Sequence, residues 1–162
     1  MKEEELMTSE AEMRLQKRGL SVPTPAKSLA NYVPAMKAGS LVFIAGQLPM
    51  KDGKIAFEGT LGKNVDIETG KKAAELCALN ILGQLKAKVG TLDNVRCVRL
   101  GGFVQSTSDF KEHSSVINGA SDLLVYALGE NGVHARAAVG CISLPLGAPV
   151  EVEAVFETIG SD

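Results

Sequence analysis

Residues 150–157 read Val-Glu-Val-Glu-Ala-Val-Phe-Glu, and this alternation brings together carboxylates, which can act as acids or bases in a reaction. Side chains of a β-strand point to opposite faces with a period of two, so the acidic residues share one face and the apolar residues the other. A row of carboxylates on one face needs water or cations beside it. The members of this row are Glu151, Glu153 and Glu157.

The basic residue of greatest interest is Arg136, which opens the strand that we expect beside this acidic strand, while Arg96 and Arg99 lie on another. One interpretation is a solvated outer face with surface ion pairs. The other places Arg136 at the mouth of a cleft with one glutamate nearby. A guanidinium can hold a small carboxylate through two parallel hydrogen bonds, and a glutamate can orient or deprotonate a water molecule. The pattern alone leaves both interpretations open.

Other short motifs do not support a different chemistry. Residues 59–63 resemble a phosphate-binding loop, but two residues separate their glycines where the motif needs four. Residues 119–123 lack the second glycine of a nucleophile elbow. The histidines and cysteines show no metal-ligand spacing, so we expect no metal ion. These residues are His113, His134, Cys77, Cys97 and Cys141.

Composition restricts the partners of the chain. Its 162 residues include 17 basic and 19 acidic ones, a net charge of −2, and 4% aromatic residues with no Trp, which disfavours a nucleic-acid partner. The odd number of cysteines, 3, is typical of a reduced intracellular protein. The N-terminus is acidic where a secretory signal is basic, and no apolar run is long enough to span a membrane. We therefore expect a cytoplasmic protein with no membrane partner.

Hydrophobic periodicity predicts the elements that would position the candidate residues. Helices are expected at 9–18, 67–89 and 109–128, the first and last with capping-box spacing at their starts. Strands are expected at 41–45, 55–57, 95–104, 137–143 and 150–158. After the first helix the order is β-β-α-β-α-β-β, which predicts an α+β fold with a single mixed sheet and two helices packed on one face. Residues 1–27 are interpreted as a helical extension and linker, and residues 28–162 as one domain.

Two segments resemble the landmarks of a known family. Residues 132–140, Gly-Val-His-Ala-Arg-Ala-Ala-Val-Gly, with Leu-Pro at 144–145 and Val-Glu-Val-Glu-Ala at 150–154, are similar to the closing signature of the Rid family. These proteins are the reactive intermediate deaminases, also called the YjgF or L-PSP family. The segment Ala-Gly-Gln-Leu-Pro at 45–49 resembles the family's strand ending in Gly-Gln-hydrophobic-Pro. The resemblance covers residues 28–158, and the N-terminal extension is similar to a less characterised branch.

The resemblance implies a chorismate-mutase-like fold and a homotrimer with clefts between subunits. It also implies hydrolysis of 2-imino acids to 2-keto acids and ammonia, with no cofactor. By position, Arg136 would hold the substrate carboxylate and Glu151 would help to hold the attacking water. The other implied pocket residues are Gly46, Tyr32, Asn118 and Ala138, the last through its backbone.

Two departures from the family pattern concern the pocket. Ala45 stands where a serine is usual and Ala138 where a cysteine is frequent, which affects the substrate side chain but leaves the carboxylate clamp intact. Two alternatives to imine hydrolysis also stay open. One is the endoribonuclease or translation-inhibitor activity attributed to some relatives. The other is a non-catalytic protein that binds small carboxylates or regulates a partner, which the same arginine would serve.

Overall fold

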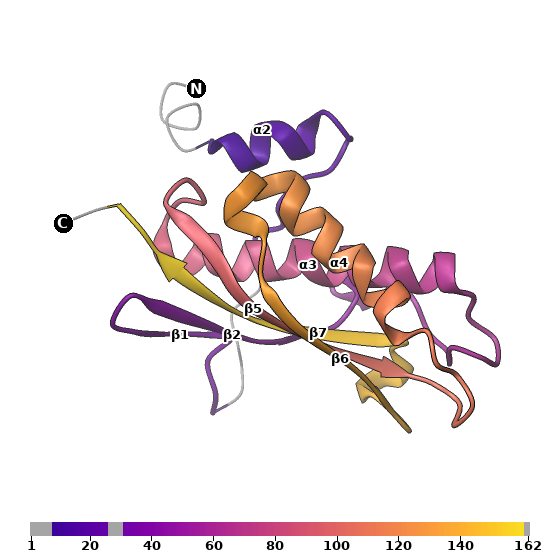
Figure 1. The fold of residues 1–162 in the computed structure, drawn as a ribbon. Coiled ribbons are helices and arrows are strands. Elements are labelled where there is room, and N and C mark those ends of the chain that lie inside the picture. Colours follow the sequence, from indigo (N-terminus) through magenta and orange to yellow (C-terminus); the bar gives the residue numbers. More distant parts are fainter. Residues whose placement is uncertain (1–7, 26–30, 161–162) are drawn as a thin grey trace.

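The computed structural model describes residues 8–25 and 31–160, which are built on a five-stranded sheet with helices on one face (Figure 1). Across the sheet the strands are β1 (Ala35–Ala38), β2 (Leu41–Gln47), β7 (Val150–Thr158), β5 (Val95–Gln105) and β6 (Ala135–Cys141). The pair β5–β6 is parallel and the other neighbours are antiparallel. The predicted α+β class with a mixed sheet is therefore confirmed. The predicted domain boundary after residue 27 lies outside the described residues.

Two strand predictions needed correction. The expected strand at 55–57 is instead a small hairpin of β3 (Met50–Lys51) and β4 (Lys54–Ile55). Its turn is made by Asp52 and Gly53, both with positive φ angles of 52° and 75°, as a tight hairpin turn requires. Strand β1 was not predicted, because this four-residue edge strand buries only one side chain and so has no readable alternation.

Helix α3 (Ile67–Val89) has the predicted bounds because both of its ends carry strong signals. The side chain of Asp66 accepts a hydrogen bond of 2.7 Å from the Thr69 N–H, which caps the first turn. Gly90 ends the helix with a φ of 90°, a conformation that suits glycine. Leu82 and Leu85 on the inner face are fully buried. Burial of each such side chain contributes about 1.5–3 kcal/mol.

Helix α4 (His113–Leu128) begins four residues later than the sequence predicted, and the expected capping box of Asp109 and Glu112 does not form. Residues 107–110 instead make a turn, in which the Phe110 N–H donates to the Thr107 carbonyl at 3.2 Å. The Phe110 ring then packs edge-on against His113, with ring centroids 5.3 Å apart. Residues 107–110 therefore form this turn and not the first turn of the helix.

Two glycines allow α4 to pack closely against the sheet and against α3. A Cβ at Gly119 would lie 2.1 Å from the carbonyl oxygen of Lys71 on α3. A Cβ at Gly102 in β5 would lie 2.6 Å from the side chain of Ile117. Both contacts are too short for any side chain, so α4 can approach its neighbours this closely only with glycine at these positions. Asn118 lies between these contact points, and its place is fixed with them.

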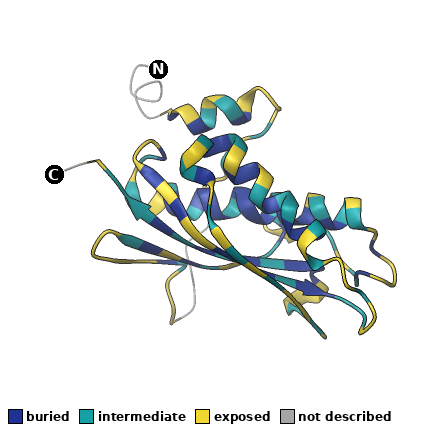
Figure 2. Cartoon of the chain, in the orientation of Figure 1, coloured by how far each residue is buried: buried dark blue, intermediate teal, exposed yellow. Residues whose placement is uncertain are grey.

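The hydrophobic core lies between the helices and the sheet (Figure 2). On β7 the residues Val150, Val152, Ala154 and Phe156 face this core and are buried. The opposite face of the sheet has no helix on it in the described chain, and we call it the open face. It carries the acidic row together with exposed apolar side chains, among them Met36, Phe43 and Val139.

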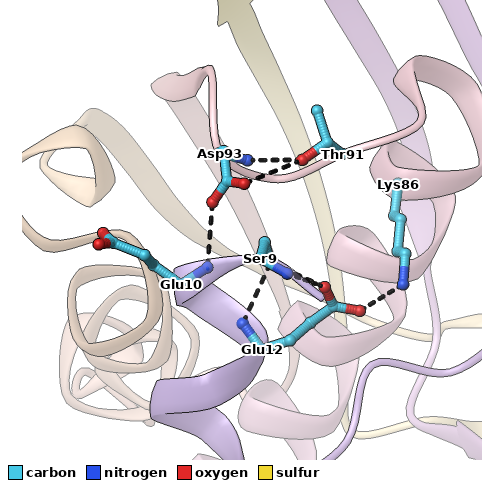
Figure 3. Close-up of polar contacts among 6 residues, drawn as sticks. All are labelled: Ser9, Glu10, Glu12, Lys86, Thr91 and Asp93. Carbon is cyan, nitrogen blue, oxygen red and sulfur yellow. Dashed lines mark hydrogen bonds and ion pairs between the residues drawn. The ribbon is translucent and has the colours of Figure 1, made fainter. Parts of the chain in front are cut away.

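The N-terminal helix α2 (Glu10–Gln16) packs outside α4, and its predicted capping box of Ser9 and Glu12 is present. Figure 3 shows how the start of α2 is attached. Glu12 forms an ion pair with Lys86 of α3, and the Glu10 N–H donates to Asp93 at 3.0 Å. At the other end, Arg14 donates to the Ala127 carbonyl at 3.0 Å, near the C-terminus of α4. No helix in the described part of the chain is long and apolar enough to cross a membrane.

Candidate active site

Arg136, the second residue of β6, extends its side chain to the helix layer and contacts α4. Its Nη1 donates to Asn118 Oδ1 at 2.8 Å and to Ser121 Oγ at 3.1 Å. Its Nη2 lies 3.5 Å from the carbonyl oxygen of Ser114. These residues are spaced by four and three positions, so they form one stripe on the face of α4 toward β6. Among the described residues no ion pair includes Arg136, so neutral acceptors hold this cation.

These contacts leave one edge of the guanidinium available to a ligand. Nη1 directs both of its hydrogens to α4, whereas Nε and the second hydrogen of Nη2 have no hydrogen-bond partner within residues 8–25 and 31–160. The Nε–H and Nη2–H groups are parallel and match the two oxygens of a carboxylate. Arg136 is half-buried, which limits the competition from water. The arrangement can therefore bind a small carboxylate through two hydrogen bonds.

Glu151 lies near the start of β7 on the open face of the sheet, directly against Gly46 of β2. A Cβ at Gly46 would lie only 2.6 Å from Glu151 Oε1 and 2.9 Å from its Cδ. The β2–β7 register shifts between Ile44 and Gln47, so Gly46 belongs to a β-bulge. Bulges bend a strand and redirect its side chains. Here the bulge presents bare backbone to the carboxylate.

The acidic row divides into paired and unpaired members. Glu157 accepts from Arg96 Nε at 2.8 Å, and Glu153 lies 3.9 Å from Arg99. Glu151 has no ion pair with any described residue. Burial raises the pKa of Glu151, and the nearby negative charge of Glu153 raises it further. A raised carboxyl pKa is typical of an acid–base group that works near neutral pH. The surface ion-pair interpretation thus fits Glu153 and Glu157, and the chemical one fits Glu151.

Tyr32 and Ala138 lie near different members of the predicted site. Tyr32 precedes β1 and is 65% exposed. In the same segment the Pro34 carbonyl accepts from the Ala45 N–H at 2.9 Å, which brings this part of the chain beside the bulge of β2. Ala138 lies on β6 two residues after Arg136 and packs against the core from the helix side. We call Arg136, Asn118 and Ala138 the arginine group. We call Glu151 and Gly46, with Tyr32 on the segment that reaches the same bulge, the glutamate group.

The two groups lie on opposite faces of the sheet, which corrects the prediction that Arg136 and Glu151 occupy adjacent strands. Strand β5 separates β6 from β7. Arg136 pairs with Leu100, which pairs with the core-facing Ala154, so all three point to the helices. Glu151 pairs with Phe103 on the open face. The error came from assuming that consecutive strands are neighbours, whereas β5 inserts between them. Within one chain these residues cannot share a pocket.

Of the polar residues around Arg136, sequence reasoning named Asn118 but missed Ser114, Ser121 and His134. Ser121 Oγ lies 2.9 Å from His134 Nε2, and His134 Nδ1 lies 2.6 Å from the Gly132 carbonyl oxygen. His134 precedes Arg136 by two positions, so a period of two would have placed both on the same side of the strand. The spacing of Ser114, Asn118 and Ser121 is also readable as a polar stripe on an otherwise apolar helix.

A groove of about 900 Å³ lies outside the arginine group and the glutamate group. It runs between residues 19–25, the β3–β4 hairpin and α3, and Gln47 is its nearest approach to the bulge of β2. None of the six predicted site residues lines it. In the described part of the chain, no three His, Cys, Asp or Glu side chains gather into a possible metal site.

The comparison with family models decides the relationship. Residues 12–157 match the model described as "YjgF/chorismate-mutase-like, putative endoribonuclease". The chain belongs to this YjgF family. Among curated relatives, Protein TCP17 of Trypanosoma cruzi is 43% identical over 145 residues, which are 88% of this chain and 91% of that protein. The predicted membership of the Rid/YjgF family is therefore confirmed, and it includes part of α2.

Solved structures of the YjgF family share the fold. Atu1372 of Agrobacterium tumefaciens, described as having unknown function, is 47% identical, has a TM-score of 0.89 and matches over 96% of each chain. RidA from the Antarctic bacterium Psychrobacter is 28% identical, with a TM-score of 0.57 over 84% of this chain and 94% of its own. The chorismate-mutase-like fold of the YjgF family is thus confirmed for this chain.

Proposed function

We propose that this protein hydrolyses 2-imino acids to 2-keto acids and ammonia in clefts between copies of the chain. The observation that carries the proposal is the guanidinium of Arg136, which neutral groups hold with one carboxylate-binding edge open. The likeness of the whole chain to a protein named RidA also supports the imine hydrolysis that the family resemblance implies. The three free cysteines suit the reducing interior of a cell, where such imines would form.

A complete site requires two copies of the chain. The arginine group of one copy must meet the glutamate group of another, because a sheet separates them within one copy. Exposed apolar residues on the open face support such contact, since Phe43 is 45% and Val139 48% exposed. The edge strand β6 would also be covered in an assembly. We propose the closed ring of three that the family resemblance implies.

The reaction needs few groups, because the carbon of a protonated imine is already electrophilic. Arg136 would bind the substrate carboxylate through Nε–H and Nη2–H. Glu151 of the neighbouring copy would accept a proton from water as the water oxygen bonds to the imine carbon. Glu151 then returns that proton to the nitrogen of the carbinolamine. As the C–N bond breaks and ammonia leaves, the hydroxyl proton passes to Glu151 and the carbonyl of the keto acid forms; release of that proton to solvent restores the carboxylate. Placement of water and substrate supplies much of the required rate.

Gly46 and Tyr32 complete this proposed site from the glutamate side, and Asn118 and Ala138 from the arginine side. Gly46 allows the Glu151 carboxylate to lie against the backbone of the bulge. Ala45 at the same bulge offers no hydroxyl, so the substrate side chain meets an apolar wall. We therefore expect imines whose own side chains are apolar, such as those left after dehydration of serine or threonine, to be preferred over imines with polar side chains.

The decisive test is a coupled assay in which a serine or threonine dehydratase generates the imine. Added protein should speed loss of the imine signal, and Arg136→Lys should reduce that effect about a hundredfold, since misplacement of substrate alone can cost that much. Arg99→Lys is the matched control, because it changes an arginine of the open face that the proposal does not use. No acceleration by the wild-type protein, or RNA cleavage that Arg136→Lys abolishes, would refute imine hydrolysis and favour the endoribonuclease alternative. Binding of pyruvate without turnover would favour the non-catalytic one.

A further inference from the structure

A chain of hydrogen bonds joins Arg136 to a histidine that has no place in the proposed reaction. Nη1 of Arg136 donates to Ser121 Oγ at 3.1 Å, and Ser121 Oγ lies 2.9 Å from His134 Nε2. The other ring nitrogen, Nδ1, lies 2.6 Å from the carbonyl oxygen of Gly132. Three elements are linked in this way: the middle of α4, the loop after it and the start of β6.

The direction of each hydrogen bond follows from which atoms carry a hydrogen and which can only accept one. A carbonyl oxygen only accepts, so Nδ1 of His134 must carry a hydrogen. In the neutral ring Nε2 is then an acceptor, and the one hydrogen that can reach it is the hydroxyl hydrogen of Ser121. The guanidinium only donates, so Ser121 Oγ accepts from Arg136. His134 therefore decides where the Ser121 hydrogen points, and this leaves the Ser121 lone pairs for Arg136.

The anchor of this chain is itself held in place. A Cβ at Gly132 would lie 2.2 Å from the carbonyl oxygen of Leu124, so the loop is pressed against the last turns of α4. Ser121 in a helix interior would otherwise turn to a carbonyl of the preceding turn. Its bond to His134 prevents this and directs it toward β6. The carbonyl of Gly132 thus has little freedom, and neither has the imidazole that donates to it.

We propose that His134 is a positioning residue for Arg136, acting through Ser121, and that it selects which edge of the guanidinium meets the substrate carboxylate. This inference rests on the proposed function, since it gives a role to groups behind the carboxylate clamp. With Asn118 and Ser121 both occupying Nη1, the guanidinium cannot turn, and the Nε–Nη2 edge stays outward. Without the directed lone pair of Ser121, the guanidinium keeps only Asn118 at Nη1 and the Ser114 carbonyl at 3.5 Å from Nη2, so it rotates more readily.

Two substitutions of His134 separate positioning from simple loop attachment. His134→Asn keeps an N–H near the place of Nδ1 for the Gly132 carbonyl but loses the acceptor for Ser121. His134→Gln places an amide oxygen near Nε2 and keeps that acceptor. We expect His134→Asn to raise the Kd for pyruvate and the KM for imine about 3- to 10-fold, the range for one lost hydrogen bond. We expect kcat to change less than about twofold, and His134→Gln to restore wild-type binding.

The pathway through Ser121 is tested by a double-mutant cycle. Ser121→Ala alone should weaken pyruvate binding as much as His134→Asn does, and the double variant should be no worse than either. Each variant should keep the wild-type oligomeric mass and a melting temperature within a few degrees. Additive effects of the two substitutions, unchanged binding in His134→Asn, or equal losses in the Asn and Gln variants would each overturn the proposal.

A ligand-free measurement distinguishes failure of this inference from failure of the proposed function. Nitrogen-15 NMR of the wild-type protein should show the Nδ1–H tautomer of His134 and slow rotation of the Arg136 guanidinium. Ser121→Ala and His134→Asn should both speed that rotation. If the wild-type protein neither binds pyruvate nor hydrolyses imines, the proposed function fails. A rotating Arg136 or the Nε2–H tautomer in the wild-type protein overturns the positioning role whatever the substrate.

Discussion

The carboxylate of Glu151 lies so close over the α-carbon of Gly46 that a methyl group on that carbon would be 2.6 Å from Oε1. The backbone of Gly46 is not in the left-handed region, so space and not torsion demands glycine here. The acidic group with the raised pKa is thus seated against a strand bulge that the sequence marks only by the dipeptide Gly-Gln.

Gly46→Ala should displace the Glu151 side chain and reduce the kcat for imine hydrolysis about tenfold or more, because the attacking water loses its holder. Pyruvate binding at Arg136 should change less than about threefold. Gly101→Ala is a matched control, because its Cβ would lie 2.9 Å from Oε1 of Glu153, which the mechanism does not use. Steady-state kinetics of both variants check the prediction, and equal losses of kcat in the two would contradict it.

Glu151→Gln should make the protein more stable and less active. The folded-state pKa of Glu151 is raised, mainly by burial, so the native protein binds its proton more tightly than the unfolded chain does. Stability from this group therefore falls as the pH rises through the interval between the unfolded and folded pKa values. At pH 7 the Gln variant should melt at a higher temperature than the wild type, and the difference should vanish near pH 3. Glu153→Gln, measured alongside, should show no such gain.

Mixing two inactive variants should restore activity if each site joins two copies. Arg136→Lys chains keep an intact glutamate group, and Glu151→Gln chains keep an intact arginine group. After unfolding and joint refolding at equal amounts, about a quarter of the sites should combine two intact groups, by random assortment in a cyclic oligomer. Activity near a quarter of the wild-type value, with a light-scattering mass of about three chains, is the expected result. Activity no higher than that of the separate variants would exclude shared sites.

The attachment of α2 should respond to acid. Burial opposes ionisation of Glu12, but its hydrogen bonds to Lys86 and Ser9 outweigh that effect and lower its pKa. The stability that it contributes is therefore present above its unfolded pKa and is lost as the pH falls through the lowered folded value. Glu12→Gln should lower the melting temperature at pH 7 and have no effect near pH 2. Glu10→Gln, on the same helix, is the control because Glu10 is largely exposed.

The sequence allowed the long elements to be predicted because their signals are local. Helix α3 has an aspartate cap at Asp66 and a glycine end at Gly90, and β7 alternates along its whole length. The start of α4 could not be read in this way, because residues 107–110 form a turn and the helix begins at His113 without a side-chain cap. Strand β1 escaped prediction because an edge strand with one buried residue leaves almost no pattern.

The members of the candidate site could be named from the sequence, but their arrangement could not. The acidic row and the arginine near it drew attention because charges on a strand need water or partners, and the family resemblance then singled out Glu151 and Arg136. Their separation onto two faces depends on β5 lying between β6 and β7, which is a matter of long-range pairing. The His134–Ser121 contact joins residues 13 positions apart on different elements, and no short-range rule brings them together.

The arginine group and the glutamate group lie on two faces of one sheet, and this has a consequence for a cell that makes the protein. A newly synthesised chain would be inert, and activity would appear only when the cellular concentration exceeds the dissociation constant of the assembly. A chain damaged in either group would also disable a site that it shares with a healthy neighbour. Because that chain still supplies its intact group to the next site, a substitution at Arg136 or Glu151 alone would lower activity only in proportion to its share of the chains. A chain that carries both substitutions would disable two sites and would act dominantly when mixed with normal copies.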